Sequence, residues 1–397
     1  MDKKKSPLTL TIICYVDTSS LNAESIQIIN FAKALKSLGH NITLIAPAIG
    51  DKKNITGIPL RHIPLFDLKF LRPLSFILFA PFFLLNSLSK DDSDAVICFD
   101  LYSAPTVIPV LRISGIPVFL YLNSIISEDM KALGRNRVLT FIADLSFSLN
   151  VRLSSFIGCV SEPVKEYVVR KLKKPKERVS VIRDAVDTEL FSPIEKEKAC
   201  NRLNLNPNYT YIGFVGSLCP WHGLDYLISA VPLIIEKNKN VRLLIVGDGE
   251  MKKILQEMSD DIGISSYIIW TGFIDYEKIP LYISSFDLCV SFFKKMRSNY
   301  GSPMKMFEYL SCARPVVASN CPEYGEFAES LSAGISVNPE NGKELSEKIS
   351  GLLQDSEKLK KMGAKGREGI LKAHTWNIRA EEMCENIYTM LEFYEKN

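Results

Sequence analysis

Short apolar runs alternate along the whole chain with segments in which apolar residues recur every three or four positions. The short runs are typical of buried strands, and the spaced segments are typical of helices that bury one face. The predicted strands are Leu8–Val16, Ile42–Ala46, Ala95–Phe99, Pro117–Leu122, Phe156–Val160, Tyr209–Ser217, Val241–Val246, Tyr267–Trp270, Leu288–Phe292 and Pro315–Ala318. Because strands and helices alternate, the sequence predicts an α/β protein with doubly wound parallel sheets.

At 397 residues the chain is long enough for two domains, and 47% hydrophobic with 23% charged residues is typical of globular proteins. The net charge of +3 gives no electrostatic support for a nucleic-acid partner. The nine cysteines include no C-x-x-C pair and the four histidines lie far apart, so we expect neither a disulfide framework nor a metal site. The scattered cysteines fit a reducing cytoplasm. We interpret the first apolar run, Leu8–Val16, as a strand and not as a signal peptide.

The segment 299–319, NYGSPMKMFEYLSCARPVVAS, carries the clearest functional pattern. Gly301 permits a turn, Ser302 is a favourable N-cap and Pro303 suits the first helical position. A helix is therefore predicted from Pro303 to about Cys312. The free backbone N–H groups at such a helix start favour the binding of an anion.

Lys305 and Glu308 lie three residues apart, on one face of this predicted helix. A cation in the first turn opposes the helix dipole, so we expect an external anion to compensate Lys305. One helix end then offers N–H groups and a cation for phosphate, and a carboxylate for sugar hydroxyls. This combination indicates a nucleotide-sugar site. The alternative is an ordinary capped helix with a solvated Glu308.

The runs GSPMKMFEY (301–309) and RPVVA (314–318) resemble the donor-binding segment of the retaining glycosyltransferases of family four, the glycosyl transferases group 1. The resemblance implies the GT-B fold, in which two Rossmann-like domains, each a doubly wound parallel sheet, face a central cleft. It implies that Glu308 holds the ribose hydroxyls. Many members carry a second glutamate where this chain has Tyr300. The loop implied to face the diphosphate and the donated sugar comprises Tyr300, Gly301, Ser302, Pro303 and Met304.

Three further corners between a strand and the following loop match the family's donor site. Loop 216–223 resembles the phosphate loop, although Ser217 and His222 stand where the family carries an arginine and a lysine. Gly247 follows another predicted strand, and Phe273 lies where relatives contact the base. The donor-binding residues implied by these corners are Gly216, Ser217, His222, Gly223, Gly247 and Phe273.

Two residues are assigned to catalysis. Asn123 follows the predicted strand Pro117–Leu122, where related transferases place a histidine or an asparagine that faces the reacting sugar. For Asn123 the alternative is a cap or turn residue. Lys305 is expected to stabilise the charge of the leaving diphosphate, in place of the basic residues that the phosphate loop lacks.

The stretch from Val179 to Pro193 resembles the family's crossing between domains, with Asp184-Ala185 in place of the usual Asn-Gly. We therefore expect an acceptor-binding domain over residues 1–186 and a nucleotide-sugar-binding domain over residues 187–374. The resemblance also implies that a last helix, residues 375–397, crosses back to the N-terminal domain.

Residues 71–88 form the most hydrophobic segment of the chain; Pro81 interrupts it, and Lys69 and Arg72 lie at its start. The segment is short for a spanning helix, which needs about 20 apolar residues. Three alternatives stay open from the sequence: a buried helix, an interfacial membrane helix and a true span.

The predicted function is transfer of a sugar from a nucleoside-diphosphate sugar to an acceptor, a glycan or lipid-linked saccharide of the cell envelope. We expect retention of configuration, no metal and no cofactor. We expect a cytoplasmic protein in peripheral contact with the inner face of the cell membrane through residues 71–88. The alternative is a catalytically inactive, transferase-like subunit that binds a partner or lipid, which Tyr300, Ser217 and His222 favour. The base, the donated sugar, the linkage and the oligomeric state stay open.

Overall fold

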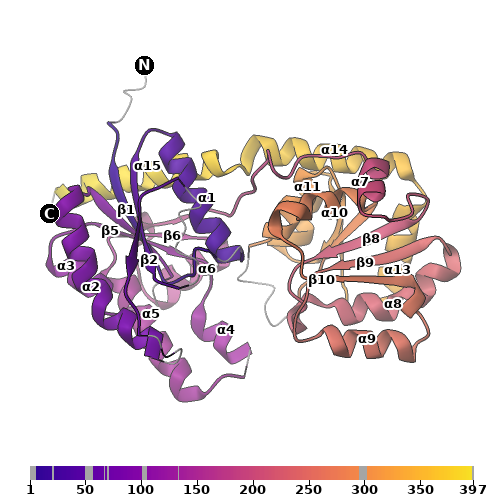
Figure 1. Cartoon of the computed structure of the whole chain (residues 1–397), viewed down its shortest axis with the longest axis horizontal. Helices are drawn as coiled ribbons and strands as arrows, with labels where there is room; N and C mark the ends of the chain where they lie inside the picture. The colour runs from indigo at the N-terminus through magenta and orange to yellow at the C-terminus, as the bar shows by residue number, and fades with distance from the viewer. Residues whose placement is uncertain are drawn as a thin grey trace. The chain divides into compact units, whose positions relative to one another are not determined.

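The computed structural model describes residues 6–19, 22–49, 57–66, 68, 71–100, 105–132, 134–294 and 302–395. The chain divides into two compact units. Unit 1 contains Met1–Asp184, Tyr300–Ser302 and Trp376–Asn397, and unit 2 contains Ala185–Asn299 and Pro303–Thr375. Each unit is a parallel sheet covered by helices (Figure 1).

In the described ranges, the sheet of unit 1 has seven parallel strands in the order β3-β2-β1-β4-β5-β6-β7. They are β1 (Thr9–Cys14), β2 (Asn41–Pro47), β3 (Leu60–Ile63), β4 (Ala95–Phe99), β5 (Val118–Leu122), β6 (Phe156–Cys159) and β7 (Val179–Val181). The inner strands are covered on both faces, which explains their continuous apolar runs. The direction of winding reverses between β1 and β4.

Helices of unit 1 lie on both faces of this sheet. A right-handed crossover places its helix on opposite faces when the chain winds in opposite directions. Helix α1 (Ala23–Ser37) therefore lies on one face, and α2 (Arg72–Asp91), α3 (Val107–Ile113) and α5 (Arg137–Leu153) lie on the other. The C-terminal helix α15 (Trp376–Glu395) packs against α1 (Figure 1). The remaining helices are α4 (Ile126–Ala132) and α6 (Glu162–Glu166).

Unit 2 has a sheet of six parallel strands within the described part of the chain, in the order β10-β9-β8-β11-β12-β13. They are β8 (Thr210–Val215), β9 (Val241–Val246), β10 (Ile268–Gly272), β11 (Leu288–Ser291), β12 (Val316–Ser319) and β13 (Gly334–Val337). Its helices are α7 (Lys196–Arg202), α8 (Leu224–Lys237), α9 (Lys252–Asp261), α10 (Ile279–Ser285), α11 (Met304–Ser311), α12 (Phe327–Ser330), α13 (Gly342–Leu353) and α14 (Ser356–Ala373).

The winding of unit 2 reverses at β8, which pairs with β9 on one side and β11 on the other. Alternate residues of β8 belong to two apolar clusters: Phe214 to the first, and Tyr211 and Val215 to the second. In an open parallel sheet, ligands bind outside the carboxyl ends of the strands at such a reversal. The fold therefore marks the ends of β8 and β11 as the expected ligand site.

Every strand predicted from the sequence is present; two have the predicted ends, and the others have ends shifted by a few residues. The stretch Val179–Val186, interpreted from the sequence as part of the crossing between domains, contains the short strand β7, and its Val186 makes an isolated bridge to Thr375. The sequence did not predict β3 or β13, because both are short edge strands without a continuous apolar run.

The predicted start of the helix in segment 299–319 is wrong by one residue. Helix α11 begins at Met304 and ends at Ser311. Pro303 is the N-cap, because its ψ of 49° lies outside the helical region, and no side chain caps the helix. Ser302 is therefore not the N-cap. Tyr300 and Gly301 lie outside the described residues.

Leu71 is the N-cap of α2 and residues 72–88 lie within this helix, which buries one face and exposes the other. Phe76 and Leu84 are buried, whereas Leu78 and Phe82 are 49% and 77% exposed. Within the described residues, α2 is the one helix long and apolar enough to cross a membrane by length and composition. Its buried face packs within unit 1, which disfavours the alternative of a helix surrounded by lipid.

Candidate active site

The candidate donor site of unit 2 lies where the winding of its sheet reverses. Three side chains from separate segments meet there: His222 follows β8, Phe293 follows β11, and Lys305 belongs to the first turn of α11. The ring of Phe293 is 5.2 Å from that of His222 and perpendicular to it. The sequence predicted Lys305 and His222 as donor-site residues, and the structure brings them together.

The ammonium group of Lys305 rests on aromatic surface. Its Nζ atom lies 4.6 Å from the centroid of the Phe214 ring and 5.5 Å from that of Phe293. Both distances are within the range of cation–π attraction. Burial lowers the pKa of Lys305 from 10.5 to about 7, against opposing effects of Cys219 and Glu308. An anion placed beside this ammonium would raise that pKa again and fix the full positive charge.

His222 holds Lys305 from the other side. Its Nδ1 lies 2.6 Å from the carbonyl oxygen of Ser217, and its Nε2 lies 3.0 Å from Lys305 Nζ. A carbonyl oxygen can only accept, so Nδ1 carries the proton and donates. In the neutral ring, Nε2 then accepts from the ammonium. The geometry therefore gives His222 the role of a positioning residue for Lys305.

The start of α11 adds backbone donors beside this cation. Its first helical hydrogen bonds run from the N–H groups of Met306 and Phe307 to the carbonyl of Pro303, at 2.8 and 3.1 Å. The N–H groups of Met304 and Lys305 precede these bonds and lie at the positive end of the helix dipole. Together with the Lys305 ammonium, they can hold an anion such as a diphosphate.

Glu308 lies one turn further along α11 and is buried, with 7% of its surface exposed. Its Oε1 accepts a hydrogen bond of 3.1 Å from the hydroxyl of Tyr276. Burial raises the pKa of Glu308 from 4.5 to about 7, while Tyr276 and Lys305 lower it. A carboxylate has about four lone-pair sites, so Glu308 retains capacity for a pair of sugar hydroxyls.

Gly216 and Gly247 allow the loops that follow β8 and β9 to approach each other. Gly216 and Gly247 have φ values of +140° and +138°, which side chains rarely permit. A Cβ atom on Gly247 would lie 2.0 Å from the carbonyl oxygen of Gly216, and a Cβ on Gly216 would lie 3.2 Å from Lys305 Nζ. The absence of these atoms keeps the space in front of Lys305 open.

The remaining donor residues surround the same edge of the sheet. Gly223 has a φ of +59° and is the N-cap of α8, and Ser217 is exposed. Phe273 follows β10 and is 76% exposed, beside the bond of 3.0 Å from the Gly247 N–H to the Gly272 carbonyl. An exposed ring at the carboxyl end of a strand can stack on a planar base.

A second lysine joins the loops that follow β8 and β11. The Lys294 N–H donates to the Trp221 carbonyl at 2.9 Å, and its Nζ forms an ion pair of 2.8 Å with Asp225. The sequence analysis missed this pair, because its members are 69 residues apart and neither belongs to a recognisable motif. The pair fixes the loop that carries His222.

In unit 1, Asn123 follows β5 and is bound by polar side chains. Its Oδ1 accepts from Gln27 Nε2 at 2.8 Å, and its N–H lies 3.1 and 3.2 Å from the two carboxylate oxygens of Asp100. Gln27 also donates to Asp184. This network fixes the amide of Asn123, whose catalytic role stays a prediction. The sequence had marked Asp184 as unusual without assigning it a role.

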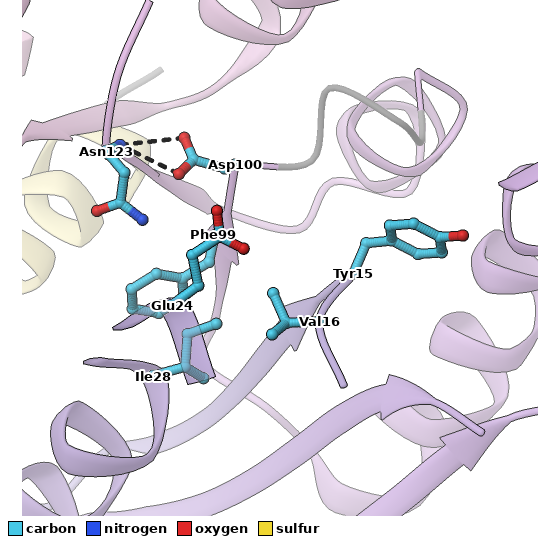
Figure 2. A pocket seen from close by; sticks show the side chains of 7 residues that line it. All are labelled: Tyr15, Val16, Glu24, Ile28, Phe99, Asp100 and Asn123. Atoms are coloured by element: carbon cyan, nitrogen blue, oxygen red, sulfur yellow. Dashed lines mark hydrogen bonds between the residues drawn. The ribbon is translucent and has the colours of Figure 1, made fainter. Parts of the chain in front are cut away.

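A pocket opens beside this network, at the reversal between β1 and β4 (Figure 2). It is lined by Tyr15, Val16, Glu24, Ile28, Phe99, Asp100 and Asn123. Burial raises the pKa of Asp100 to about 8; the Asn123 N–H opposes this shift, and Glu24 adds to it. Carboxyl and amide groups beside aromatic rings are suited to hydroxyl groups on an apolar scaffold.

The structure leaves one part of the predicted site open. Tyr300 and Gly301 lie outside the described residues, so their proximity to Lys305 stays a prediction. In the described ranges, no three or more histidine, cysteine, aspartate or glutamate side chains form a group that could hold a metal ion. The sequence analysis also missed Phe214 and Tyr276. An alternating strand pattern marks Phe214 only as core, and nothing in the sequence links Tyr276 to Glu308.

Two doubly wound parallel sheets, each with a reversal of winding, are the architecture of the GT-B fold. The chain matches two family profiles: Glycosyltransferase Family 4 over residues 25–190 and Glycosyl transferases group 1 over residues 195–369. It belongs to the GT-B glycosyltransferases of group 1 and is an enzyme that transfers a sugar from a nucleotide sugar.

Relatives of this chain include an uncharacterized glycosyltransferase of Methanocaldococcus jannaschii, 24% identical over 90% of this chain and 91% of that protein. A GDP-mannose-dependent alpha-(1-6)-phosphatidylinositol monomannoside mannosyltransferase of Mycobacterium tuberculosis is 23% identical, over 53% of this chain and 56% of its own length. Among solved structures, Anabaena HepE in complex with UDP has a TM-score of 0.74 at 17% identity, covering 96% of this chain and 100% of that chain. This last likeness shows the shared fold.

Proposed function

We propose that the chain moves a sugar from a nucleoside-diphosphate sugar to a hydroxyl of a glycan or lipid-linked saccharide. Configuration at the anomeric carbon is retained and no metal ion takes part. The observation that carries the donor half of this proposal is the Lys305 ammonium, held by His222 at the open start of α11. The acceptor half rests on the polar pocket of unit 1.

Lys305 acts on the leaving group. When the glycosidic bond breaks, negative charge grows on the diphosphate, and preorganised donors stabilise that charge more in the transition state than in the bound substrate. The ammonium, together with the N–H groups of Met304 and Lys305, supplies this stabilisation. These groups take the place of a divalent metal, so a chelator should leave the reaction unchanged.

Glu308 and Phe273 hold the nucleoside. The buried Glu308 carboxylate accepts from the paired ribose hydroxyls while Tyr276 keeps it oriented. Phe273, which is 76% exposed, packs on the base. One relative is a GDP-mannose-dependent transferase and one similar structure contains UDP, so guanine and uracil are both candidate bases for the donor of this chain.

The acceptor hydroxyl enters through unit 1. Asn123, fixed by Gln27, accepts or donates to a hydroxyl beside the reacting carbon. Asp100 and Glu24 line the same pocket (Figure 2). Carboxyl groups recognise sugar hydroxyls. We further propose that the protein works at the cytoplasmic face of the cell membrane, which the exposed apolar side of α2 supports.

The proposal is tested by offering UDP-glucose, GDP-mannose and ADP-glucose to the protein. One of them should raise the melting temperature, because a ligand that binds only the folded state stabilises it. The same donor should then be transferred or slowly hydrolysed equally well with and without EDTA. NMR of the released sugar should show the donor's own anomeric configuration first. Inverted product, or turnover abolished by EDTA and restored by magnesium, contradicts the proposal.

A further inference from the structure

Helix α5 of unit 1 exposes large apolar side chains to solvent and buries several polar ones. Its outward stripe consists of large apolar side chains that are 40% to 68% exposed: Val138, Leu139, Phe141, Ile142, Leu145 and Leu149. Its buried face contains Phe147 and Val151 together with the polar residues Thr140, Ser146 and Asn150. A helix covering a sheet in water normally shows the opposite arrangement. The exposed stripe is therefore suited to bind an apolar partner.

Helix α2 continues this surface. It lies on the same face of the sheet as α5, and α3 packs against both helices; all three are labelled in Figure 1. Leu74, Leu78 and Phe82 form one row along α2 and are 48%, 49% and 77% exposed. At the end of α3, Ile113 is 86% exposed. The three helices thus present apolar side chains on one face of unit 1.

The charged residues around α5 indicate which kind of partner its exposed apolar stripe would bind. Arg135 and Arg137 precede the exposed stripe and Arg152 follows it, and all three are exposed. Within α5 itself the one acidic residue is Asp144, which lies beside the stripe and is partly buried. A second copy of the chain paired through this face would bring like charges together. An anionic lipid surface instead accepts both the apolar stripe and the arginines.

We propose that α5, together with α2, docks this protein flat on an anionic lipid surface, with the apolar stripe in the acyl boundary and the arginines at the headgroups. This inference goes beyond the transfer reaction and adds α5 to the membrane contact expected for residues 71–88. The pocket of unit 1 would then belong to a protein that is bound to a membrane surface.

Flotation with vesicles tests the proposal. Full-length protein is mixed with vesicles of phosphatidylcholine alone or with 30% phosphatidylglycerol. The test variant is Phe141→Glu with Leu145→Glu. The matched control is Leu233→Glu with Ile254→Glu, which places the same charges at residues of unit 2 that are 40% and 54% exposed. Circular dichroism and the donor-induced melting shift check that each protein is folded.

Wild type and the unit 2 control should float with the anionic vesicles, and the partition coefficient of Phe141→Glu/Leu145→Glu should fall at least about 100-fold. The pair Arg137→Gln/Arg152→Gln should lose about 10- to 30-fold on anionic vesicles, since each arginine near such a surface contributes about 1 kcal/mol. Donor binding should be the same in all of them, so the outcome is independent of the transfer reaction.

Three outcomes overturn the proposal: wild type stays with the soluble fraction, the α5 variant floats as wild type does, or light scattering shows a lipid-free dimer that the α5 variant splits into monomers. The third outcome would identify a second copy as the partner of the stripe.

Discussion

Binding of the nucleotide sugar should take up protons above pH 7 and release them below it. In the free protein, burial lowers the pKa of Lys305 to about 7 and raises that of Glu308 to about 7. A bound diphosphate favours the charged ammonium, and ribose hydroxyls favour the ionised carboxylate. Both groups are therefore charged in the complex, so Lys305 gains a proton on binding and Glu308 loses one.

The size of the effect follows from these pKa values of about 7. At pH 8 Lys305 would take up ~0.9 proton and Glu308 would release ~0.1, a net uptake of ~0.8. At pH 6 the two contributions exchange, and the net release is ~0.8 proton. At pH 7 they cancel. The reversal of sign at neutral pH is specific to a lysine and a glutamate that respond to the same ligand.

Titration calorimetry in buffers of different ionisation enthalpy measures this exchange. The slope of the observed enthalpy against the buffer enthalpy gives the number of protons at each pH. An intact nucleotide sugar is used, because its diester phosphates do not titrate near pH 7. Lys305→Met should keep the release at pH 6 and lose the uptake at pH 8, and Glu308→Gln should do the reverse.

The predicted proton exchange would be contradicted if calorimetry showed that donor binding to wild type exchanges no protons at pH 6 and pH 8. It would also be contradicted if Lys305→Met behaved as wild type at pH 8. Either result would mean that the diphosphate does not lie beside the ammonium of Lys305.

Glu308→Ala should weaken donor affinity at least about tenfold in calorimetry, because hydrogen bonds to a charged group contribute roughly 1.5–3 kcal/mol; equal affinity would remove Glu308 from the ribose site. Gly247→Ala should lower the free energy of unfolding of unit 2, measured by urea denaturation, by at least about 2 kcal/mol, because alanine is strained at this positive φ and its Cβ would collide with the Gly216 carbonyl. Gly351→Ala, a helical site with open space, is its control and should not destabilise. His222→Ala should lower turnover less than Lys305→Ala does, and should lower the pH at which turnover falls, because the ammonium loses an acceptor that stabilises its charged form; an unchanged pH profile would contradict the positioning role.

The sequence predicted the strands well because buried parallel strands are nearly continuous apolar runs. Ala95–Phe99 and Val241–Val246 have the predicted ends. It failed at edge strands such as β3, whose LRHI sequence mixes polar and apolar residues. It also failed at the start of α11, where the backbone of Pro303 turns out of the helical region and delays the helix by one residue.

Of the candidate donor site, the sequence predicted the residues that belong to local motifs, among them Lys305, Glu308 and Gly216. It could not predict their partners, because Tyr276 and Phe214 come from distant segments that meet only in the folded sheet. The interaction of His222 with Lys305 likewise depends on the reversal of winding at β8. Composition marked 71–88 as apolar, but exposure in the folded unit was needed to distinguish the two faces of α2.

The central claim is that Lys305 stabilises the charge that develops on the leaving diphosphate. It is tested most directly by the turnover number of Lys305→Ala, in sugar transfer or in donor hydrolysis if no acceptor is found. The turnover number should fall by about 10²-fold or more, in line with the loss of one electrostatic donor, whereas the donor dissociation constant should change less. Turnover equal to that of wild type, with the donor bound, would contradict the account.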